Sequence, residues 1–167
     1  GFQPGFSFGQ IGDKFPDNTY LAMRFLPTLA GTLLPVVIYL LLIQLQFSKP
    51  AAVAAGLFVA LENALLIQSR FMLLDAFLLL FGFTAWWLYA RYRNHPHVAY
   101  LIAAGVFAGA ATSVKWTGIS FLAIIGILEL LKLRWKNLVI LAVVPFIVYF
   151  SLFALHFSLL TKPGPGD

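Results

Sequence analysis

Residues 62–75 read Glu-Asn-Ala-Leu-Leu-Ile-Gln-Ser-Arg-Phe-Met-Leu-Leu-Asp, and long apolar runs lie on both sides of this stretch. It contains two carboxylates, Glu62 and Asp75, with the amide of Gln68 and the guanidinium of Arg70 between them. An ionised side chain in hydrocarbon is costly unless it pairs or faces water, so such residues usually mark a functional site. If the stretch is helical throughout, Glu62 and Arg70 lie roughly 12 Å apart along the axis, with the carboxylate inside the bilayer and the guanidinium near its edge. The alternative is a structural ion pair buried between helices.

The composition is that of a membrane protein. Of the 167 residues, 61% are hydrophobic and only 10% are charged, whereas soluble domains have about 45–50% apolar and about 25% charged residues. We therefore expect an all-α, polytopic transmembrane helical bundle. The apolar runs do not alternate with polar residues as the strands of an outer-membrane barrel do. The chain has no cysteine, and its net charge of +5 forms no basic, aromatic-interleaved patch of the kind that binds nucleic acid.

The apolar runs predict six transmembrane helices, interrupted by short polar breaks. We expect them at residues 20–46, 51–69, 71–93, 98–114, 117–131 and 138–160. Residues 1–19 carry glycine and proline turn signals and are typical of an extracytoplasmic loop, and residues 161–167 are typical of the start of another. Because the chain starts at Gly1 rather than Met, we expect it to be a segment of a longer protein.

Charged residues differ between the two faces of the predicted bundle. One face holds six Lys or Arg side chains and a single acid, and the other holds five of each sign. The first set is Lys49, Arg91, Arg93, Lys132, Arg134 and Lys136 with Glu129; the second is Lys14, Arg24, Arg70, Lys115 and Lys162 with Asp13, Asp17, Glu62, Asp75 and Asp167. The positive-inside rule places the first face in the cytoplasm. Balanced charges close to helix ends indicate a site, so we expect the chemistry on the extracytoplasmic face.

Several short motifs occur in an order that resembles the protein O-mannosyltransferases, which are dolichyl-phosphate-mannose–protein mannosyltransferases with the GT-C glycosyltransferase fold. They are Ile11-Gly12-Asp13, the Tyr20–Arg24 motif, Glu62-Asn63 with the Gln68–Asp75 motif, the Ser113–Gly118 motif, His156-Phe157 and the Gly164–Asp167 motif. Each motif alone is weak, but the ordered set is specific and covers nearly the whole chain.

The resemblance implies a membrane glycosyltransferase that moves mannose from a polyprenyl (dolichyl) phosphate donor to Ser or Thr hydroxyls of secreted proteins. Its partners would be the lipid-linked donor, the acceptor protein and the bilayer, with no further cofactor, and a dimer is left open. Short loops favour a bacterial cell membrane over the endoplasmic reticulum membrane, which also stays open. In the family the catalytic acidic pair lies earlier in the first external loop, so we carry over no general base and expect this segment alone to be inactive.

The resemblance also implies roles for particular side chains. Arg24 matches a functional arginine of the family, and its permanently charged, forked guanidinium suits a phosphate or a catalytic carboxylate. Arg70 and Lys115 would help to neutralise the lipid phosphate. Asp75 would orient Arg70 or line the acceptor groove. His156 would reach the donor phosphate, with a histidine paired between helices as the alternative.

Three further side chains on this face are weaker candidates for the site: Glu62, Gln68 and Trp116. Trp116 is more typical of an anchor at the membrane interface than of a platform for a sugar. On the opposite face, His95 and His97 lie two residues apart without a third ligand in view, so we expect no metal site.

Other classes of membrane protein remain as alternatives. A transporter or lipid flippase core also contains broken helices and buried charges, but residues 20–93 and 98–160 show no inverted repeat. Another lipid-linked sugar transferase is a further alternative, against which the His156-Phe157 and Gly164–Asp167 motifs argue. A purely structural membrane subunit is disfavoured by the density of charges on the extracytoplasmic face.

Overall fold

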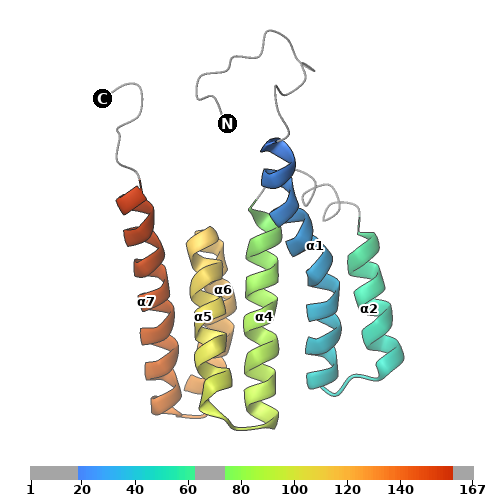
Figure 1. Cartoon of the computed structure of the whole chain (residues 1–167). Helices are drawn as coiled ribbons and strands as arrows, with labels where there is room; N and C mark the ends of the chain where they lie inside the picture. Colours follow the sequence, from blue (N-terminus) through green and yellow to red (C-terminus); the bar gives the residue numbers. More distant parts are fainter. Residues whose placement is uncertain (1–18, 63–73, 160–167) are drawn as a thin grey trace.

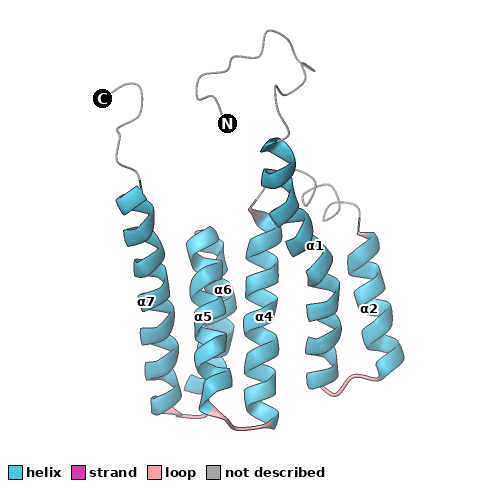
Figure 2. Cartoon of the chain, viewed as in Figure 1, coloured by secondary structure: helices cyan, strands magenta, loops and turns pink. Residues whose placement is uncertain are grey.

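The computed structural model describes residues 19–62 and 74–159, and every regular element within these ranges is a helix (Figures 1 and 2). The predicted fold class, an all-α membrane bundle, is confirmed. By length and composition, Arg24–Gln44 and Trp135–Leu159 are each able to cross a membrane, with mean hydropathies of 2.2 and 2.7. The other described helices are shorter or less apolar, and they complete the bundle.

The helices run alternately up and down, so that their ends gather at two opposite ends of the bundle (Figure 1). In chain order they are α1 (Thr19–Gln44), α2 (Lys49–Leu61), α4 (Asp75–Asn94), α5 (Val98–Val114), the 3₁₀ turn η1 (Trp116–Gly118), α6 (Ile119–Leu130) and α7 (Trp135–Leu159). We call the end where α4 begins and α5 stops the Lys115 end, and the opposite end the Glu129 end.

Three helix boundaries differ from those expected by three residues or more. Helix α2 ends at Leu61, because Glu62 has extended backbone angles (φ −67°, ψ 118°), so the helix predicted over residues 51–69 does not continue through Glu62. Helix α4 begins at Asp75, whose carboxylate lies in the first turn, where the helix dipole favours negative charge. Helix α7 begins at Trp135 rather than at residue 138.

Helices α4 and α5 form the centre of the bundle. Helix α4 packs against α1, α5 and α6, and α5 packs against α7. Small residues allow this closeness: Ala104 and Ala108 of α5 are completely buried in the main core cluster. Gly109 faces α7, where an added Cβ would lie 2.8 Å from the Cα and the carbonyl oxygen of Pro145. Without a hydrophobic driving force between helices in lipid, such close packing is a main source of association.

A buried polar network ties the Glu129 end together. The Glu129 side chain is fully buried, and both of its oxygens accept short hydrogen bonds. The Tyr89 hydroxyl donates to Oε1 at 2.6 Å and the Asn137 amide donates to Oε2 at 2.6 Å. Arg134 Nη1 lies 4.0 Å from Oε1. The network therefore links α4, α6 and the start of α7, whereas the sequence suggested only that Glu129 was one charge on a basic face.

Candidate functional site

The Lys115 end carries most of the candidate side chains that the structure describes. Arg24 of α1, Asp75 of α4, Lys115 after α5 and His156 of α7 all belong to this end of the bundle (Figure 1). Arg70 and Gln68 lie outside the described residues. The structure therefore gives the positions of only part of the predicted set, whose roles stay a prediction.

Lys115 and Asp75 form an ion pair that joins α4 to α5. Lys115 Nζ donates to Asp75 Oδ1 at 3.2 Å, and the two side chains are 56% and 32% exposed. An ion pair this accessible contributes about 0–1 kcal/mol, because water and salt screen it. Asp75 therefore holds the Lys115 side chain only weakly. The ammonium has three N–H donors, so it is able to bind a ligand while it contacts Asp75.

The backbone after α5 explains why Lys115 lies at a corner of the bundle. Lys115 has extended angles (φ −157°, ψ 139°), and η1 then folds back onto α5. Gly118 in this turn is buried, and a Cβ there would collide with the carbonyl group of Ala111. Glycine at position 118 thus permits the close return of the chain that presents Lys115 at the end of the bundle.

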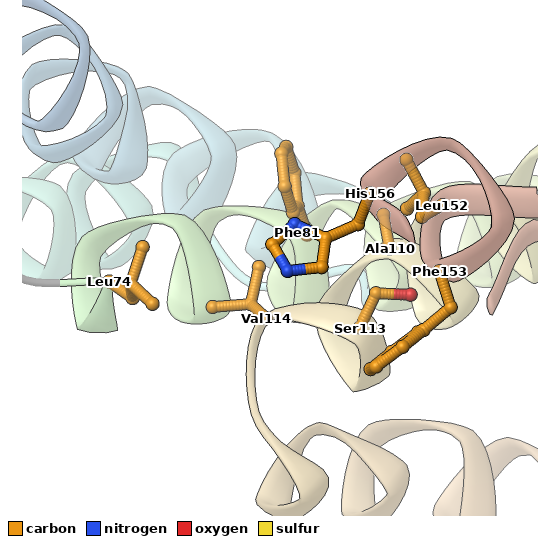
Figure 3. A pocket seen from close by; sticks show the side chains of 8 residues that line it. All are labelled: Leu74, Phe81, Ala110, Ser113, Val114, Leu152, Phe153 and His156. Carbon is orange, nitrogen blue, oxygen red and sulfur yellow. The ribbon is translucent and has the colours of Figure 1, made fainter. Parts of the chain in front are cut away.

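An apolar cavity of about 460 Å³ lies beside the ion pair, between α4, α5 and α7 (Figure 3). Six of its eight lining side chains are apolar, and the two polar ones are Ser113 and His156. The lining residues are Leu74, Phe81, Ala110, Ser113, Val114, Leu152, Phe153 and His156. Leu74 and Val114 directly precede Asp75 and Lys115, so the charged pair adjoins the cavity.

The two polar side chains of the cavity differ in the contacts that they make within the protein. The Ser113 hydroxyl donates to the Gly109 carbonyl at 2.9 Å within α5, which leaves its oxygen as an acceptor. His156 lines the cavity from α7 (Figure 3), and its ring lies 5.8 Å from that of Phe157. Apolar walls with a few polar groups at one side are typical of a site for a ligand with a long apolar part.

Arg24, Glu62 and Trp116 do not line this cavity. Arg24 is exposed on α1, and its carbonyl accepts a hydrogen bond from Thr28 at 2.8 Å. Glu62 ends α2, which packs on α1. Trp116 is 68% exposed and its ring lies 5.8 Å from that of Tyr149, beside a separate apolar pocket of about 280 Å³. This position suits an interfacial anchor better than a sugar platform.

Metal binding finds no support in residues 19–62 and 74–159, where no three His, Cys, Asp or Glu side chains cluster. His97 instead serves α5 as an N-cap, since its Nδ1 accepts a hydrogen bond from the Ala99 amide at 3.4 Å.

The sequence did not single out the apolar walls of the cavity. Ser113 belongs to the Ser113–Gly118 motif, but nothing in that motif indicates that its side chain lines a cavity. Phe81, Leu152 and Phe153 carry no signal of their own, because each lies in a helix that is apolar on most sides. Only the packing of α4, α5 and α7 shows that these side chains face a common space.

Known proteins similar to this chain agree on one family. The family model described as dolichyl-phosphate-mannose-protein mannosyltransferase matches residues 1–161. Protein O-mannosyl-transferase 1 of Mus musculus is 32% identical over all of this chain and 26% of its own length. Dolichyl-phosphate-mannose–protein mannosyltransferase 1 of Saccharomyces cerevisiae is 32% identical over 99% of this chain and 23% of its own length.

A third relative, protein O-mannosyltransferase 1 of Drosophila melanogaster, is 31% identical over all of this chain and 21% of its own length. The chain thus spans about a quarter of the length of the curated relatives that it matches. No solved structure matches it significantly.

Proposed function

Because the chain belongs to the dolichyl-phosphate-mannose–protein mannosyltransferase family, we propose that the full-length protein transfers mannose from a polyprenyl-phosphate donor to Ser or Thr hydroxyls of secreted proteins. The observation that carries the proposal for this segment is the half-exposed Lys115 beside an apolar cavity. The segment supplies part of the donor site, and the base that activates the acceptor comes from elsewhere in the protein.

The shape and polarity of the site match the two halves of such a donor. A polyprenyl tail is apolar and fits the cavity walls between α4, α5 and α7. Its phosphate lies where the walls end, within reach of Lys115 and His156. Asp75 positions the Lys115 ammonium, which has three donors and is able to hold the carboxylate and a phosphate oxygen together.

The charge arrangement suits the chemistry of the transfer. The acceptor oxygen forms a bond to the anomeric carbon of mannose while the bond from that carbon to the phosphate oxygen breaks. The acceptor proton passes to the base, and the lipid phosphate leaves with one more negative charge than it had in the donor. A fixed cation beside that phosphate stabilises the charge as it develops. Lys115 fills this role, and Arg24 is a second cation at the same end.

The membrane face of the site follows from charge. Six Lys and Arg residues gather at or near the Glu129 end, and this distribution supports a cytoplasmic position for that end. The Lys115 end, with its mixed charges, then faces the extracytoplasmic or lumenal side. This is the side on which secreted acceptors are found, in either a bacterial cell membrane or the endoplasmic reticulum. Arg70 and Gln68 belong to the proposed site on the strength of the resemblance alone. Family membership leaves the transporter alternative without support.

A substitution at Lys115 tests the proposal in the full-length protein. Lys115→Gln should lower the rate of mannose transfer from labelled polyprenyl-phosphate-mannose to a Ser/Thr peptide at least about tenfold, through kcat more than through the donor KM. Lys115→Arg should restore part of the rate. The matched control is Lys132→Gln, which removes the same charge from an exposed position at the Glu129 end. Equal rates for both Gln variants would exclude Lys115 from the site.

A second test concerns Arg24. Arg24→Ala should abolish mannose transfer while leaving the amount of protein inserted in the membrane unchanged. The reason is that the proposed role of Arg24 depends on its positive charge and not on the packing of its side chain. Insertion is measured by resistance to carbonate extraction. Unchanged transfer would remove Arg24 from the site.

A further inference from the structure

A second groove, far from the proposed donor site, lies at the Glu129 end. It has a volume of about 340 Å³ and runs along α4, between the last turn of α1 and the middle of α6. Helices α1 and α6 both pack on α4 but scarcely on each other, which leaves the groove open between them. Its residues are Leu41, Gln44, Leu45, Trp86, Tyr89, Ala90, Arg93, Asn94, Ile124, Ile125 and Leu128.

The groove is polar at one end and apolar along the rest of its length. Gln44, Arg93 and Asn94 lie at the ends of their helices, and the Asn94 amide donates to both the carbonyl and the side-chain oxygen of Gln44, at 2.7 and 3.0 Å. Toward the middle of the bundle the walls are aliphatic or aromatic. From Arg93 to Trp86 the groove follows α4 for about 10 Å. The groove thus changes from polar to apolar along the membrane normal. A phospholipid changes in the same direction, from its headgroup to its acyl chains.

Arg93 is the charged group at the polar end. Its Nη1 donates to the Tyr89 hydroxyl at 3.4 Å, and within the described ranges this is its one hydrogen-bond partner in the protein. Neither salt bridge described above includes Arg93. Glu129, the described acid at this end of the bundle, already accepts hydrogen bonds from Tyr89 and Asn137. A guanidinium has five N–H donors, so most of those of Arg93 remain for an anionic ligand.

We propose that this groove binds an anionic glycerophospholipid, with its phosphate on Arg93 and one acyl chain along α4. Charge complementarity selects the ligand, because basic side chains predominate at this end of the bundle and its one nearby carboxylate is buried. The lipid comes from the leaflet at the Glu129 end, which is the cytoplasmic leaflet in the orientation proposed above. The site is separate from mannose transfer and does not need that activity to exist.

Lipid titration of the purified, delipidated full-length protein tests the proposal. Bound dioleoyl-phosphatidylglycerol is counted by native mass spectrometry, with dioleoyl-phosphatidylcholine as the reference lipid. The wild type should bind phosphatidylglycerol more tightly, and Arg93→Gln should weaken that binding about fivefold. Arg91→Gln is the matched control: it removes the same charge two residues away, but Arg91 lies over the Tyr100 ring at 5.1 Å and does not line the groove.

A second pair of variants tests the apolar part. Ile124→Trp places a large ring in the groove from a position that is 45% exposed, and it should also weaken phosphatidylglycerol binding. Ile127→Trp, on the same helix but outside the groove, should not. Three results would overturn the proposal: equal binding of the two lipids by the wild type, equal losses in Arg93→Gln and Arg91→Gln, or no lipid bound because other parts of the protein or a second copy cover the groove.

Discussion

At the scale of single residues, two carboxylates in this protein have opposite environments. Asp75 is 32% exposed and pairs with a lysine that is more exposed still. Glu129 is fully buried and accepts two hydrogen bonds of 2.6 Å. Ion pairs that water reaches contribute little to stability, whereas stranding the partners of a buried carboxylate is expensive. The first carboxylate is therefore suited to function and the second to structure.

Replacement of Glu129 should destabilise the protein strongly. Glu129→Leu leaves the buried Tyr89 hydroxyl without an acceptor. It also removes one acceptor of the partly buried Asn137 amide, which keeps the Tyr92 hydroxyl at 3.0 Å. The variant should lower the free energy of unfolding by about 3 kcal/mol. Glu129→Gln keeps one acceptor oxygen and should cost less. Both are measured by SDS titration of the purified full-length protein. Adding Tyr89→Phe to Glu129→Leu should recover part of the loss, because the hydroxyl is no longer stranded. A Leu variant as stable as the wild type would show that the network is dispensable.

The Lys115–Asp75 pair should behave in the reverse manner. Asp75→Asn should change the free energy of unfolding by less than about 1 kcal/mol in the same titration, because the pair is exposed to solvent. It should nevertheless slow mannose transfer, since the Lys115 ammonium loses the group that positions it. A large loss of stability would mean that the ion pair mainly holds α4 against α5.

What the sequence could predict at this scale depends on distance along the chain. Asp75 and Lys115 could each be placed at the end of a span, but their contact joins residues 40 positions apart and depends on how α4 and α5 pack. The contacts of Glu129 escape prediction for a local reason. The sequence predicts the sixth span from residue 138, which leaves Asn137 in a loop, whereas α7 begins at Trp135 and brings Asn137 to Glu129.

At the scale of helices, the close contact between α5 and α7 depends on Gly109, which has no side chain. Gly109→Val would place a Cβ 2.8 Å from backbone atoms of Pro145, which cannot give way as a flexible side chain would. The variant should separate the two helices and lower the apparent melting temperature of the full-length protein in detergent. It should also reduce transfer, because Ser113 and His156 line the cavity from these helices.

The control for this prediction is a glycine with free space around it. An added Cβ at Gly126 in α6 meets nothing within 4 Å. Gly126→Ala should leave stability unchanged or raise it by up to about 1 kcal/mol, since alanine favours the helix more than glycine does. Equal losses of stability in Gly109→Val and Gly126→Ala would contradict the idea that contact with α7 is decisive.

Patterns along the sequence predicted the helices better than their ends. Apolar runs mark a helix in lipid almost regardless of the order of the residues within them. The ends depend on the backbone conformation at single positions. Glu62 has extended angles directly after α2, and Gly118 allows η1 to return close to Ala111. Hydropathy averaged over a window captures neither feature.

At the scale of the whole molecule, the two ends of the bundle differ in both charge and chemistry. The Lys115 end combines acids and bases beside an apolar cavity. The Glu129 end has an excess of lysine and arginine, one buried acid, and a groove with an arginine at its mouth. The proposed donor site and the proposed lipid site therefore lie in opposite leaflets. Such a division requires one fixed orientation of the bundle in the membrane.

Single cysteines test that orientation, because this chain contains none. In full-length protein cleared of other cysteines, Trp116→Cys at the Lys115 end and Lys132→Cys at the Glu129 end occupy exposed positions. In sealed vesicles of known orientation, a membrane-impermeant maleimide should label position 116 only from the extracytoplasmic side and position 132 only from the cytoplasmic side. Both should react fully after the vesicles are opened. Labelling in the reverse sense would place the proposed donor site on the cytoplasmic side, where secreted acceptors are absent. Labelling of both positions from the same side would contradict their placement at opposite ends of the bundle.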